Sequence, residues 1–471
     1  MAMKRPTPSA RAPSYRPLSF WHDSLPEGDP VRRPPLVGAT EADVVIVGAG
    51  YTGLWAAYYL TELDPGMSIA VVEAEIAGFG ASGRNGGWAS GEFSMQTDRA
   101  AAAVGRQGVV AQYRAVWDAI DEIGRVSAAE GIDCHFAKGG SINLATSQAQ
   151  LERMRDDLVE WRALGLGDEH VRVLDAVETR MRVRSDNAIA SMYTPHCASI
   201  HPARLARGLA EVVEGRGVRI FEGSCVSEIG PGMVRTGEGS VKAGTVLRCL
   251  EAFNSQVRGT GRWLAPVYSL MIATEPLPES VWDDIGLAER ETFHDGRHLV
   301  IYGQRTADNR FAFGGRGAPY HFGSAMKPEF ERDPETHRSI SEALRWLFPA
   351  VADARITHTW GGAVGVPRDW TASVSFDAAT RLGRAGGFVG AGVTPSNLAG
   401  RTLADLVMGL ETERTRLPWV GHESPQWEPE PLRFIGINLG RALAPMADNR
   451  EFRTGRRSQV AGRLLGLLTG H

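Results

Sequence analysis

The chain has 471 residues, of which 43% are hydrophobic and 23% are charged, proportions that exclude a disordered or a fibrous protein. The formal net charge of −4 provides no field that favours nucleic acid or anionic lipid, so we expect no nucleic-acid partner. The length allows about two to four domains, or two interleaved ones.

The first part of the chain predicts a strand, a helix and a second strand. Residues 43–47 (DVVIV) are an apolar, β-branched run, typical of a strand that is buried on both faces of a parallel sheet. Residues 54–63 predict a helix, and residues 68–73 predict another buried strand. Together these three segments form a βαβ unit.

Helices are expected in the next part of the chain. Residues 100–129 carry apolar side chains three or four positions apart, and Ser147 with Gln150 is a capping box for a further helix. Pro202 suits the first turn of a third helix, after which residues 218–229 resemble a pair of strands.

Antiparallel strands are expected after residue 263. Residues 264–317 contain three apolar runs that resemble the strands of an antiparallel sheet. Residues 386–394 predict a strand and a turn, and residues 395–410 predict a helix. We expect this last strand to rejoin the first sheet.

A glycine-rich turn connects the first strand to the first helix. Its GxGxxG residues are Gly48, Ala49, Gly50, Tyr51, Thr52 and Gly53. The first glycine makes the tight turn, the second lets the backbone approach a pyrophosphate, and the third lets the helix pack on the strand. Glu73 follows the last glycine by about 20 residues, where a carboxylate accepts hydrogen bonds from ribose hydroxyls. This register favours a dinucleotide site over a glycine turn without a ligand.

The loop at residues 77–88 indicates which dinucleotide is bound. The loop is irregular and nearly free of charge, and a domain that binds only NAD does not need such a loop at this place. In flavoproteins a loop at this place passes the pyrophosphate and the isoalloxazine ring, and its glycines permit close approach. The residues that we expect to bind cofactor here are Ala81, Ser82, Arg84, Asn85, Gly86 and Gly87. A flexible surface loop is the alternative.

A third part of the cofactor site is expected before the helix at residues 395–410. A helix N-terminus carries positive charge and free N–H groups, so it favours an anion such as the reduced flavin ring. The residues concerned are Gly390, Gly392, Val393 and Thr394. The alternative is an ordinary helix with Thr394 as its N-cap. We also place Ala74, Val226 and Gly362 among the cofactor-binding residues.

Four segments make a family resemblance specific. They are GAGYTGLWAAYYL, AGFGASGRNGG, WGGAVGVPRDW and GAGVTPSNLAGRTLADL. Over about residues 40–412 the chain resembles the glycine oxidase and D-amino acid oxidase superfamily of FAD-dependent amine oxidoreductases, and these segments are most similar to its gamma-glutamylputrescine oxidoreductase-like branch. The resemblance implies FAD, a two-domain fold and hydride transfer to flavin N5 from the C–H next to a nitrogen. The resulting imine hydrolyses in water.

Two positions depart from relatives of this family. Asn85 stands where relatives with covalent flavin carry His or Cys, so we expect noncovalent FAD. Ala312 stands nearest to the oxygen-activating Lys of sarcosine oxidase-like relatives, so the choice between O2 and another electron acceptor stays open. No second GxGxxG follows a strand, so the electrons are expected to come from the substrate itself.

The substrate is expected to be a small amine that contacts the antiparallel sheet and its loops. The residues proposed for this role are Tyr268, Tyr302, Arg305, Trp360, Arg368 and Asp369. Arg305 or Arg316 would clamp a carboxylate or phosphonate, and Asp369 would pair with a distal ammonium. The alternatives are surface ion pairs for the arginines and core packing for the aromatic residues.

The predicted fold class is α/β plus α+β, with a Rossmann-like FAD-binding domain interleaved with an antiparallel-sheet substrate domain. The FAD-binding domain is assigned residues 41–100, 196–263 and 376–412, and the substrate domain residues 101–195 and 264–375. Residues 1–40 form a proline-rich N-terminal arm, and residues 413–471 form a C-terminal extension. We expect its amphipathic end, residues 456–471, to pack on this chain or on a partner subunit.

Cysteine usage and the termini suggest a cytoplasmic protein. Cys134, Cys197, Cys225 and Cys249 show no C-x-x-C spacing, so no metal site is expected. No apolar segment follows the basic start of the chain, so we expect no export signal. Residues 44–60 are interrupted by glycines, and we expect no membrane span.

Two alternatives to amine oxidation are left open by the sequence. The enzyme could use FAD to oxidise a 2-hydroxy acid or a polyol phosphate, which an arginine clamp would suit equally well. The protein could instead be a binding subunit of a larger complex, in which FAD only stabilises the fold.

Overall fold

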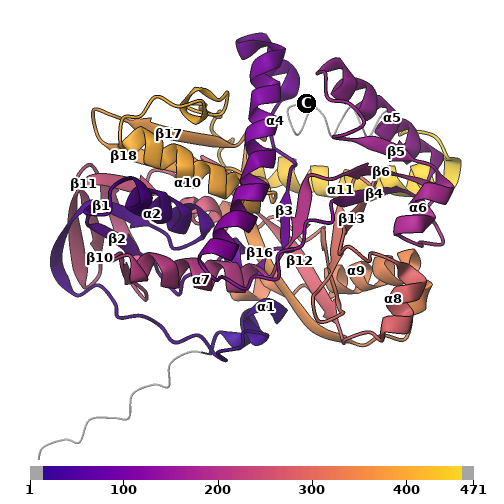
Figure 1. The fold of residues 1–471 in the computed structure, drawn as a ribbon, viewed down its shortest axis with the longest axis horizontal. Helices are drawn as coiled ribbons and strands as arrows, with labels where there is room; N and C mark the ends of the chain where they lie inside the picture. Colours follow the sequence, from indigo (N-terminus) through magenta and orange to yellow (C-terminus); the bar gives the residue numbers. More distant parts are fainter. Residues whose placement is uncertain (1–13, 459–471) are drawn as a thin grey trace, which may run out of the picture.

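The computed structural model describes residues 14–458, which form two eight-stranded sheets and one two-stranded sheet. Figure 1 shows the two large sheets side by side, with α2 and α10 on the first and α8 and α9 at the second. The long helix α4 (Thr97–Ala129) packs against α10 (Val393–Val407) and is interrupted at Gly105, where φ is 75°.

The first sheet is built around a parallel centre. Its strand order is β17-β18-β11-β1-β2-β8, with β9 and β10 joined to β11 as an antiparallel extension. The strands are β1 (Gly38–Val47), β2 (Ile69–Val72), β8 (Arg219–Phe221), β9 (Val226–Gly230), β10 (Met233–Thr236), β11 (Gly239–Arg248), β17 (Ser373–Asp377) and β18 (Leu382–Gly386). Because β1 pairs in parallel with both β2 and β11, the carboxyl ends of these strands meet at one edge.

Burial on both faces explains the unbroken apolar run of β1. Val44 and Ile46 pack in the core beneath three helices, whereas Val45 and Val47 pack in a separate cluster on the other face. The helices are α2 (Tyr51–Leu63), α7 (Pro202–Gly215) and α10 (Val393–Val407). The βαβ unit predicted from the sequence is therefore confirmed, and its helix begins three residues earlier than expected.

The second sheet is mostly antiparallel, with the order β16-β12-β15-β14-β13-β4-β6-β5. Its strands are β4 (Ser141–Ala145), β5 (Arg172–Leu174), β6 (Ala190–Thr194), β12 (Leu264–Thr274), β13 (Thr292–Asp295), β14 (Ile301–Arg305), β15 (Phe311–Arg316) and β16 (Ile356–Pro367). The helices α8 (Glu279–Ile285) and α9 (Pro334–Leu347) cover an apolar face that includes Phe293 and Phe313. The opposite face is directed toward the first sheet and carries Tyr302 and Met271.

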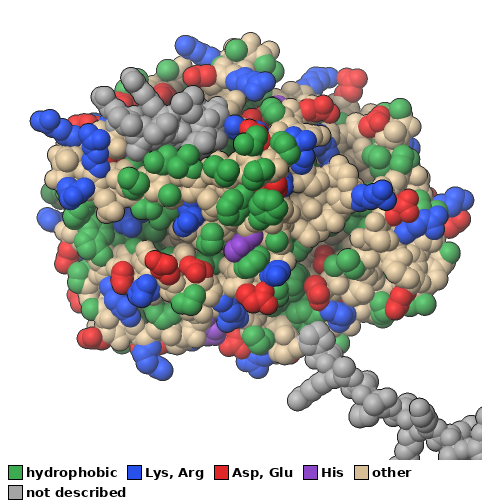
Figure 2. Space-filling model, turned by 180° about the vertical axis from the view of Figure 1, so that it is seen from behind, with side chains coloured by type: hydrophobic (Ala, Val, Ile, Leu, Met, Phe, Trp, Pro, Cys, Tyr) green, Lys and Arg blue, Asp and Glu red, His purple; other side chains and the backbone are tan. Residues whose placement is uncertain are grey.

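The remaining elements connect and cover the sheets. They are α1 (Phe20–Asp23), α3 (Ala81–Arg84), α5 (Gln148–Ala163), α6 (Ala176–Arg182), α11 (Leu432–Thr454) and the paired strands β3 (Trp88–Ser90) and β7 (Cys197–Ser199). Figure 2 shows apolar side chains gathered over α11, where Leu432, Ile435 and Met446 are exposed. Among the described residues, no helix is both long and apolar enough to cross a membrane.

Four expectations from the sequence need correction. Residues 218–229 form two strands that do not pair with each other, because β8 joins β2 and β9 joins β10. The strand expected at residues 386–394 ends at Gly386, where φ reaches 155°, and it does rejoin the first sheet through β11. Ser147 caps α5, but the Gln150 side chain binds Thr146, so the capping box is half formed.

The fourth correction concerns the proposed domain limits. β17 lies across the limit between residues 375 and 376, yet it pairs with β18 in the first sheet. We therefore propose that the last piece of the FAD-binding domain begins before residue 373. The C-terminal tail from residue 459 onward lies outside the described residues, as do residues 1–13.

Candidate active site

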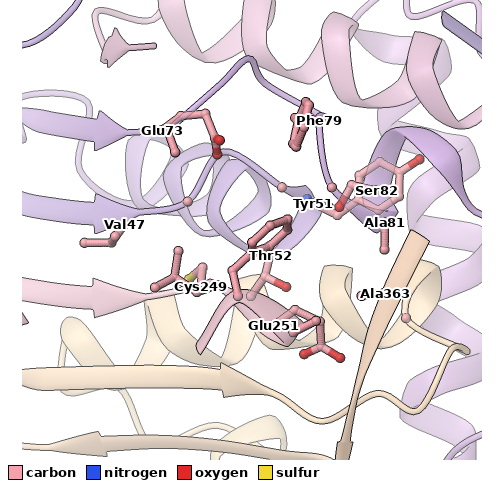
Figure 3. Close-up of a pocket in the computed structure, with 18 of the residues that line it drawn as sticks. Val47, Tyr51, Thr52, Glu73, Phe79, Ala81, Ser82, Cys249, Glu251 and Ala363 are labelled. Carbon is pink, nitrogen blue, oxygen red and sulfur yellow. Dashed lines mark hydrogen bonds between the residues drawn. The ribbon is translucent and has the colours of Figure 1, made fainter. Parts of the chain in front are cut away.

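A cavity of about 440 Å³ lies at the carboxyl ends of β1, β2 and β11. Figure 3 shows Val47, Glu73 and Cys249 where these strands end, with Ala81 and Ser82 across the cavity from them. The N-termini of α2 and α10 also lie at this cavity, through Tyr51 and Val393. Helix N-termini and the carboxyl ends of parallel strands are where dinucleotides bind in open α/β sheets.

The glycine turn has the geometry that a dinucleotide requires. Gly48 has a φ of 104°, and a Cβ there would lie 2.6 Å from the Cys249 carbonyl oxygen. A Cβ on Gly53 would lie 2.1 Å from the Gly48 carbonyl oxygen, so α2 can pack on β1 only with glycine at this position. Both positions therefore need glycine for the fold, and Gly48 and Gly50 also line the cavity.

Glu73 is held as an acceptor at the end of β2. Its carboxylate accepts hydrogen bonds from the backbone N–H groups of Ala49, at 2.8 Å, and Glu75, at 3.0 Å. Burial raises the pKa of Glu73, and these two donors oppose the rise. The geometry fits FAD, because a carboxylate at the second strand, glycines at the turn and two helix N-termini match the ribose, the pyrophosphate and the ring.

The loop after β2 is fixed by two indole groups. The Trp21 Nε1–H donates to the Asn85 carbonyl oxygen at 2.8 Å, and the Trp360 Nε1–H donates to the Arg84 carbonyl oxygen at 2.9 Å. The Arg84 guanidinium is buried and forms an ion pair with Glu331 at 2.6 Å. The loop thus has a defined shape beside the cavity rather than that of a flexible surface loop.

A Trp21→Ala substitution should weaken both the fold and cofactor retention. The side chain is 1% exposed and packs beside Phe20 and Trp360, so its removal is expected to cost about 3–5 kcal/mol of unfolding free energy. Chemical denaturation and the rate of FAD release measure the two effects. Trp21→Phe should keep most of the packing and lose the N–H bond; if it matches the alanine variant in stability, packing is not the cause.

A second cavity of about 150 Å³ adjoins the first. Both are lined by Ala81, Asn85, Val364, Gly390 and Val393, so the two cavities meet at the N-terminus of α10. The polar side chains that line the second cavity include Arg84, Ser90, Glu92, Ser269, His294, Tyr302 and Arg316.

Arg316 is the dominant charge of the second cavity. Its Nη2 donates to the Val389 carbonyl oxygen at 2.7 Å. Among residues 14–458 it forms no ion pair within 4.0 Å, although the Glu92 carboxylate lines the same cavity. Burial lowers the pKa of Arg316. The Tyr302 hydroxyl and the Ser269 hydroxyl are hydrogen-bonded at 2.7 Å on the same sheet face. A half-buried guanidinium without an ion-pair partner, beside two hydroxyl groups, favours a carboxylate ligand.

Most of the cofactor-binding residues predicted from the sequence line these cavities. They are Gly48, Gly50, Tyr51, Thr52, Glu73, Ala74, Ala81, Ser82, Arg84, Asn85, Gly86, Val226, Gly362, Gly390, Gly392 and Val393. Ala49, Gly53, Gly87 and Thr394 line neither. The Ala49 N–H is bound by Glu73, Gly87 packs against the Gln304 amide, and Thr394 is fully buried within α10.

Five of the six predicted substrate residues lie away from the second cavity, and only Tyr302 lines it. Arg305 lies on the opposite face of β14 from Tyr302, where it binds Glu279, because residues an odd number of positions apart on a strand point to opposite faces. Tyr268 lies on the core face of β12 for the same reason.

The other three corrections concern residues with structural partners. Arg368 forms an ion pair with Glu428, and Asp369 forms one with His422, so both bind the C-terminal extension. Trp360 is 1% exposed and supports the loop through Arg84 rather than lining the cavity. None of these three residues lines the second cavity.

Sequence reasoning missed several cavity residues. After β11 these are Cys249, Leu250, Glu251, Ala252, Phe253, Gln256 and Val257, and in the second cavity they include Glu92, Ser269 and His294. The apolar run TVLRCL at residues 245–250 was a usable signal, because ligands bind beyond the carboxyl ends of parallel strands. Glu92 and His294 gave no such signal, since they come together only in the folded chain.

Glu251 should make stability depend on pH. Burial raises its pKa to about 7, although Gly387 N–H and Phe388 N–H donate to its carboxylate. A carboxyl with a raised pKa stabilises the fold below the unfolded value of 4.5, and this contribution is lost as the pH rises through about 7.

The FAD-free protein should therefore lose about 1–3 kcal/mol of unfolding free energy between pH 5 and pH 8 relative to a Glu251→Gln variant. Urea unfolding of both proteins across this range measures the difference. Parallel stability curves would contradict the assignment to Glu251.

Comparison with known proteins decides the family. The model of the FAD dependent oxidoreductase family (DAO) matches residues 43–406. The chain belongs to this family. Its cofactor is FAD, and the protein is an oxidoreductase, so the resemblance predicted from the sequence is confirmed.

Similar proteins cover most of this FAD-dependent oxidoreductase. A probable oxidoreductase OrdL of Rhizobium meliloti is 30% identical over 85% of this chain and 90% of its own length. The gamma-glutamylputrescine oxidoreductase of Escherichia coli is 29% identical over 78% of this chain and 84% of its own. The crystal structure of glycine oxidase from Geobacillus kaustophilus superposes with a TM-score of 0.65 at 21% identity, over 79% of this chain and 96% of that one. The predicted fold class is thereby confirmed.

Proposed function

We propose that this enzyme oxidises the carbon–nitrogen bond of a small amine that also carries a carboxylate, such as an amino acid or an amino acid conjugate. FAD is held noncovalently in the first cavity and the substrate in the second. The observation that carries the proposal is the half-buried Arg316, which has no ion-pair partner among the described residues and lines the cavity that meets the FAD cavity. The similar gamma-glutamylputrescine oxidoreductase and glycine oxidase are named for substrates that are amines, which supports this chemistry.

The chain supplies position and charge for the reaction. FAD, when bound, accepts the hydride from the carbon next to the nitrogen. Arg316 would bind the substrate carboxylate, and the hydroxyl groups of Tyr302 and Ser269 would orient it. The N-terminus of α10 favours negative charge where the cavities meet. No general base is required, provided that the amine binds unprotonated.

Asn85 supports noncovalent binding of FAD. Its amide nitrogen donates to the Ala81 and Ser82 carbonyl oxygens, and its amide oxygen accepts from the Gly87 N–H at 2.7 Å. The side chain is therefore used to shape the loop, and an amide is not a nucleophile that could attach to the ring. Denaturation of the holoenzyme should release all of its flavin into the supernatant.

The electron acceptor is proposed to be other than O2. Ala312 is fully buried in an apolar cluster with Phe20, Trp21 and Met271, and no lysine lines either cavity among the described residues. An activating ammonium is thus missing from these walls. A quinone or an electron-transfer protein would serve instead.

Anaerobic titration of the holoenzyme tests the proposal. Amino acids, N-methyl amino acids and amide conjugates of polyamines are added while the flavin absorbance is followed. Bleaching by a carboxylate-bearing amine is expected, with slow return of colour when air is admitted and fast return with a quinone. Bleaching only by 2-hydroxy acids or polyol phosphates would establish the alternative enzyme. Bleaching only by dithionite would favour a structural flavin.

A further inference from the structure

A third cavity, of about 560 Å³, lies apart from the two already described and shares no lining residue with them. Its walls are the carboxyl end of β11, the strand β18, the loop at residues 259–263 and residues 423–426 of the C-terminal extension. Arg248 follows Val246 by two positions on β11, so it projects on the sheet face away from α10. A cavity of this size is in the range of small-molecule sites.

Two arginines dominate this cavity. The Arg248 and Arg384 guanidinium groups lie over the same Trp263 ring, at 5.3 and 4.6 Å from its centroid. The Arg248 Nε and the Trp263 Nε1 are buried and have no hydrogen-bond partner within residues 14–458. Arg262 also lines the cavity, although its Nε donates to the Trp427 carbonyl oxygen. The cavity is therefore walled by two unsatisfied donors, the charged Arg248 Nε and the neutral Trp263 Nε1.

The counter-charge within the protein is small. Arg248 forms no ion pair among the described residues, and Arg384 reaches only Glu423, at 3.9 Å, whose side chain is 85% exposed. Burial and the neighbouring Arg384 lower the pKa of Arg248 to about 10. The buried Cys249 thiol, whose pKa burial raises to about 12, provides no negative charge. Two partly buried cations so close together destabilise the free protein.

We propose that this third cavity binds a small molecule through a phosphate group. The two guanidinium groups provide planar, forked donors that match phosphate oxygens, and the Trp263 indole N–H adds a further donor. The Ser424 hydroxyl also lines the cavity but donates to the Thr371 carbonyl oxygen. The oxygens of a phosphate group are arranged tetrahedrally and accept hydrogen bonds from several directions. They therefore suit donors on three walls of the cavity better than the two coplanar oxygens of a carboxylate. The volume exceeds that of inorganic phosphate, so the phosphate belongs to a larger metabolite or nucleotide.

Calorimetric titration of the holoenzyme tests the proposal. The probes are inorganic phosphate, pyrophosphate and AMP, each in a chloride buffer, with citrate as the carboxylate comparison. One saturable site per chain is expected, with AMP or pyrophosphate binding more tightly than inorganic phosphate. Arg248→Gln and Arg384→Gln should each weaken this binding at least about tenfold, because each removes a charge-assisted donor.

Two further variants control the experiment. Arg235→Gln removes an arginine of β10 that is half-exposed and paired with Glu228, so phosphate affinity should stay unchanged. Glu423→Gln removes the nearby carboxylate and should tighten phosphate binding. Because the Glu423 side chain is 85% exposed, this variant is expected to fold. It therefore tests the site even if Arg248→Gln fails to fold. Bound FAD, read from the visible spectrum, confirms that each variant is folded.

Three results would overturn the proposal. They are the absence of saturable binding for every phosphate, equal affinity in the wild type and in both cavity variants, and tighter binding of citrate than of any phosphate. Tightest binding by inorganic phosphate would overturn the assignment of a larger phosphorylated ligand and leave the free ion as the ligand of this cavity. None of these readouts depends on amine oxidation, so the proposed function can fail while this inference stands.

Discussion

An Arg316→Met variant is expected to lose about 10²–10³-fold in kcat/KM for a carboxylate-bearing amine, because removing one member of a buried charge pair costs several kcal/mol. The methionine side chain keeps much of the volume of the arginine stem, so FAD content should be unchanged. Steady-state kinetics with a quinone acceptor would measure the loss, with the flavin spectrum as the check on cofactor content.

Arg305→Met provides the matched control for this prediction. Arg305 lies on the neighbouring strand β14, but its side chain is on the other sheet face and is paired with Glu279. Its kinetics should stay close to those of the wild type. A methyl ester of the substrate should be oxidised at similar rates by the wild type and by Arg316→Met. An equal loss of activity toward acid and ester would show that Arg316 does not bind the carboxylate.

A Gly50→Val substitution is expected to lower FAD affinity by about 10–10²-fold. A Cβ at this position lies 3.0 Å from the Ser82 Oγ and projects into the space that the pyrophosphate must occupy, and overpacking of this kind costs about 1–3 kcal/mol. The apoprotein should still fold, since the added atoms meet a movable side chain. Fluorescence titration of the apoprotein with FAD measures the affinity.

Two other glycines make this prediction specific. Gly215 has no atom within 4 Å of an added Cβ, so Gly215→Ala should bind FAD like the wild type. Gly53→Ala should fail at the level of folding, because its Cβ meets the Gly48 carbonyl oxygen at 2.1 Å. Normal FAD affinity in a folded Gly50→Val protein would place the pyrophosphate elsewhere.

The cofactor cavity was largely predictable because its parts are local. The turn from Gly48 to Gly53, the acid at Glu73 and the loop at residues 77–88 follow each other in the chain, and each geometry is set by a few neighbouring residues. The burial of β1 on both faces was also predictable, because no polar residue interrupts its apolar run after Asp43.

The substrate side was predicted poorly because a single strand position decides the face. Tyr302 and Arg305 are three residues apart, so an odd spacing places one at the cavity and the other in contact with Glu279. The composition of the segment does not indicate which face is which. The helix α11 was missed for a different reason: Gly436, Gly440 and Pro445 lower its helix propensity, and contacts such as Asp448 with the His298 and Leu299 N–H groups hold it in place.

The interleaved order of the strands sets when the enzyme can first capture its cofactor during synthesis. β1 emerges early, but its neighbour β11 lies almost 200 residues later, and Gly390 and Val393 close the cavity later still. At translation rates of about 5–20 residues per second, roughly 20–80 s separate the start of the chain from the last of these residues. β1 can pair early with β2, but its other edge stays unpaired until β11 is made. A ribosome that stops before residue 393 therefore releases a chain whose FAD cavity lacks the wall formed by the N-terminus of α10.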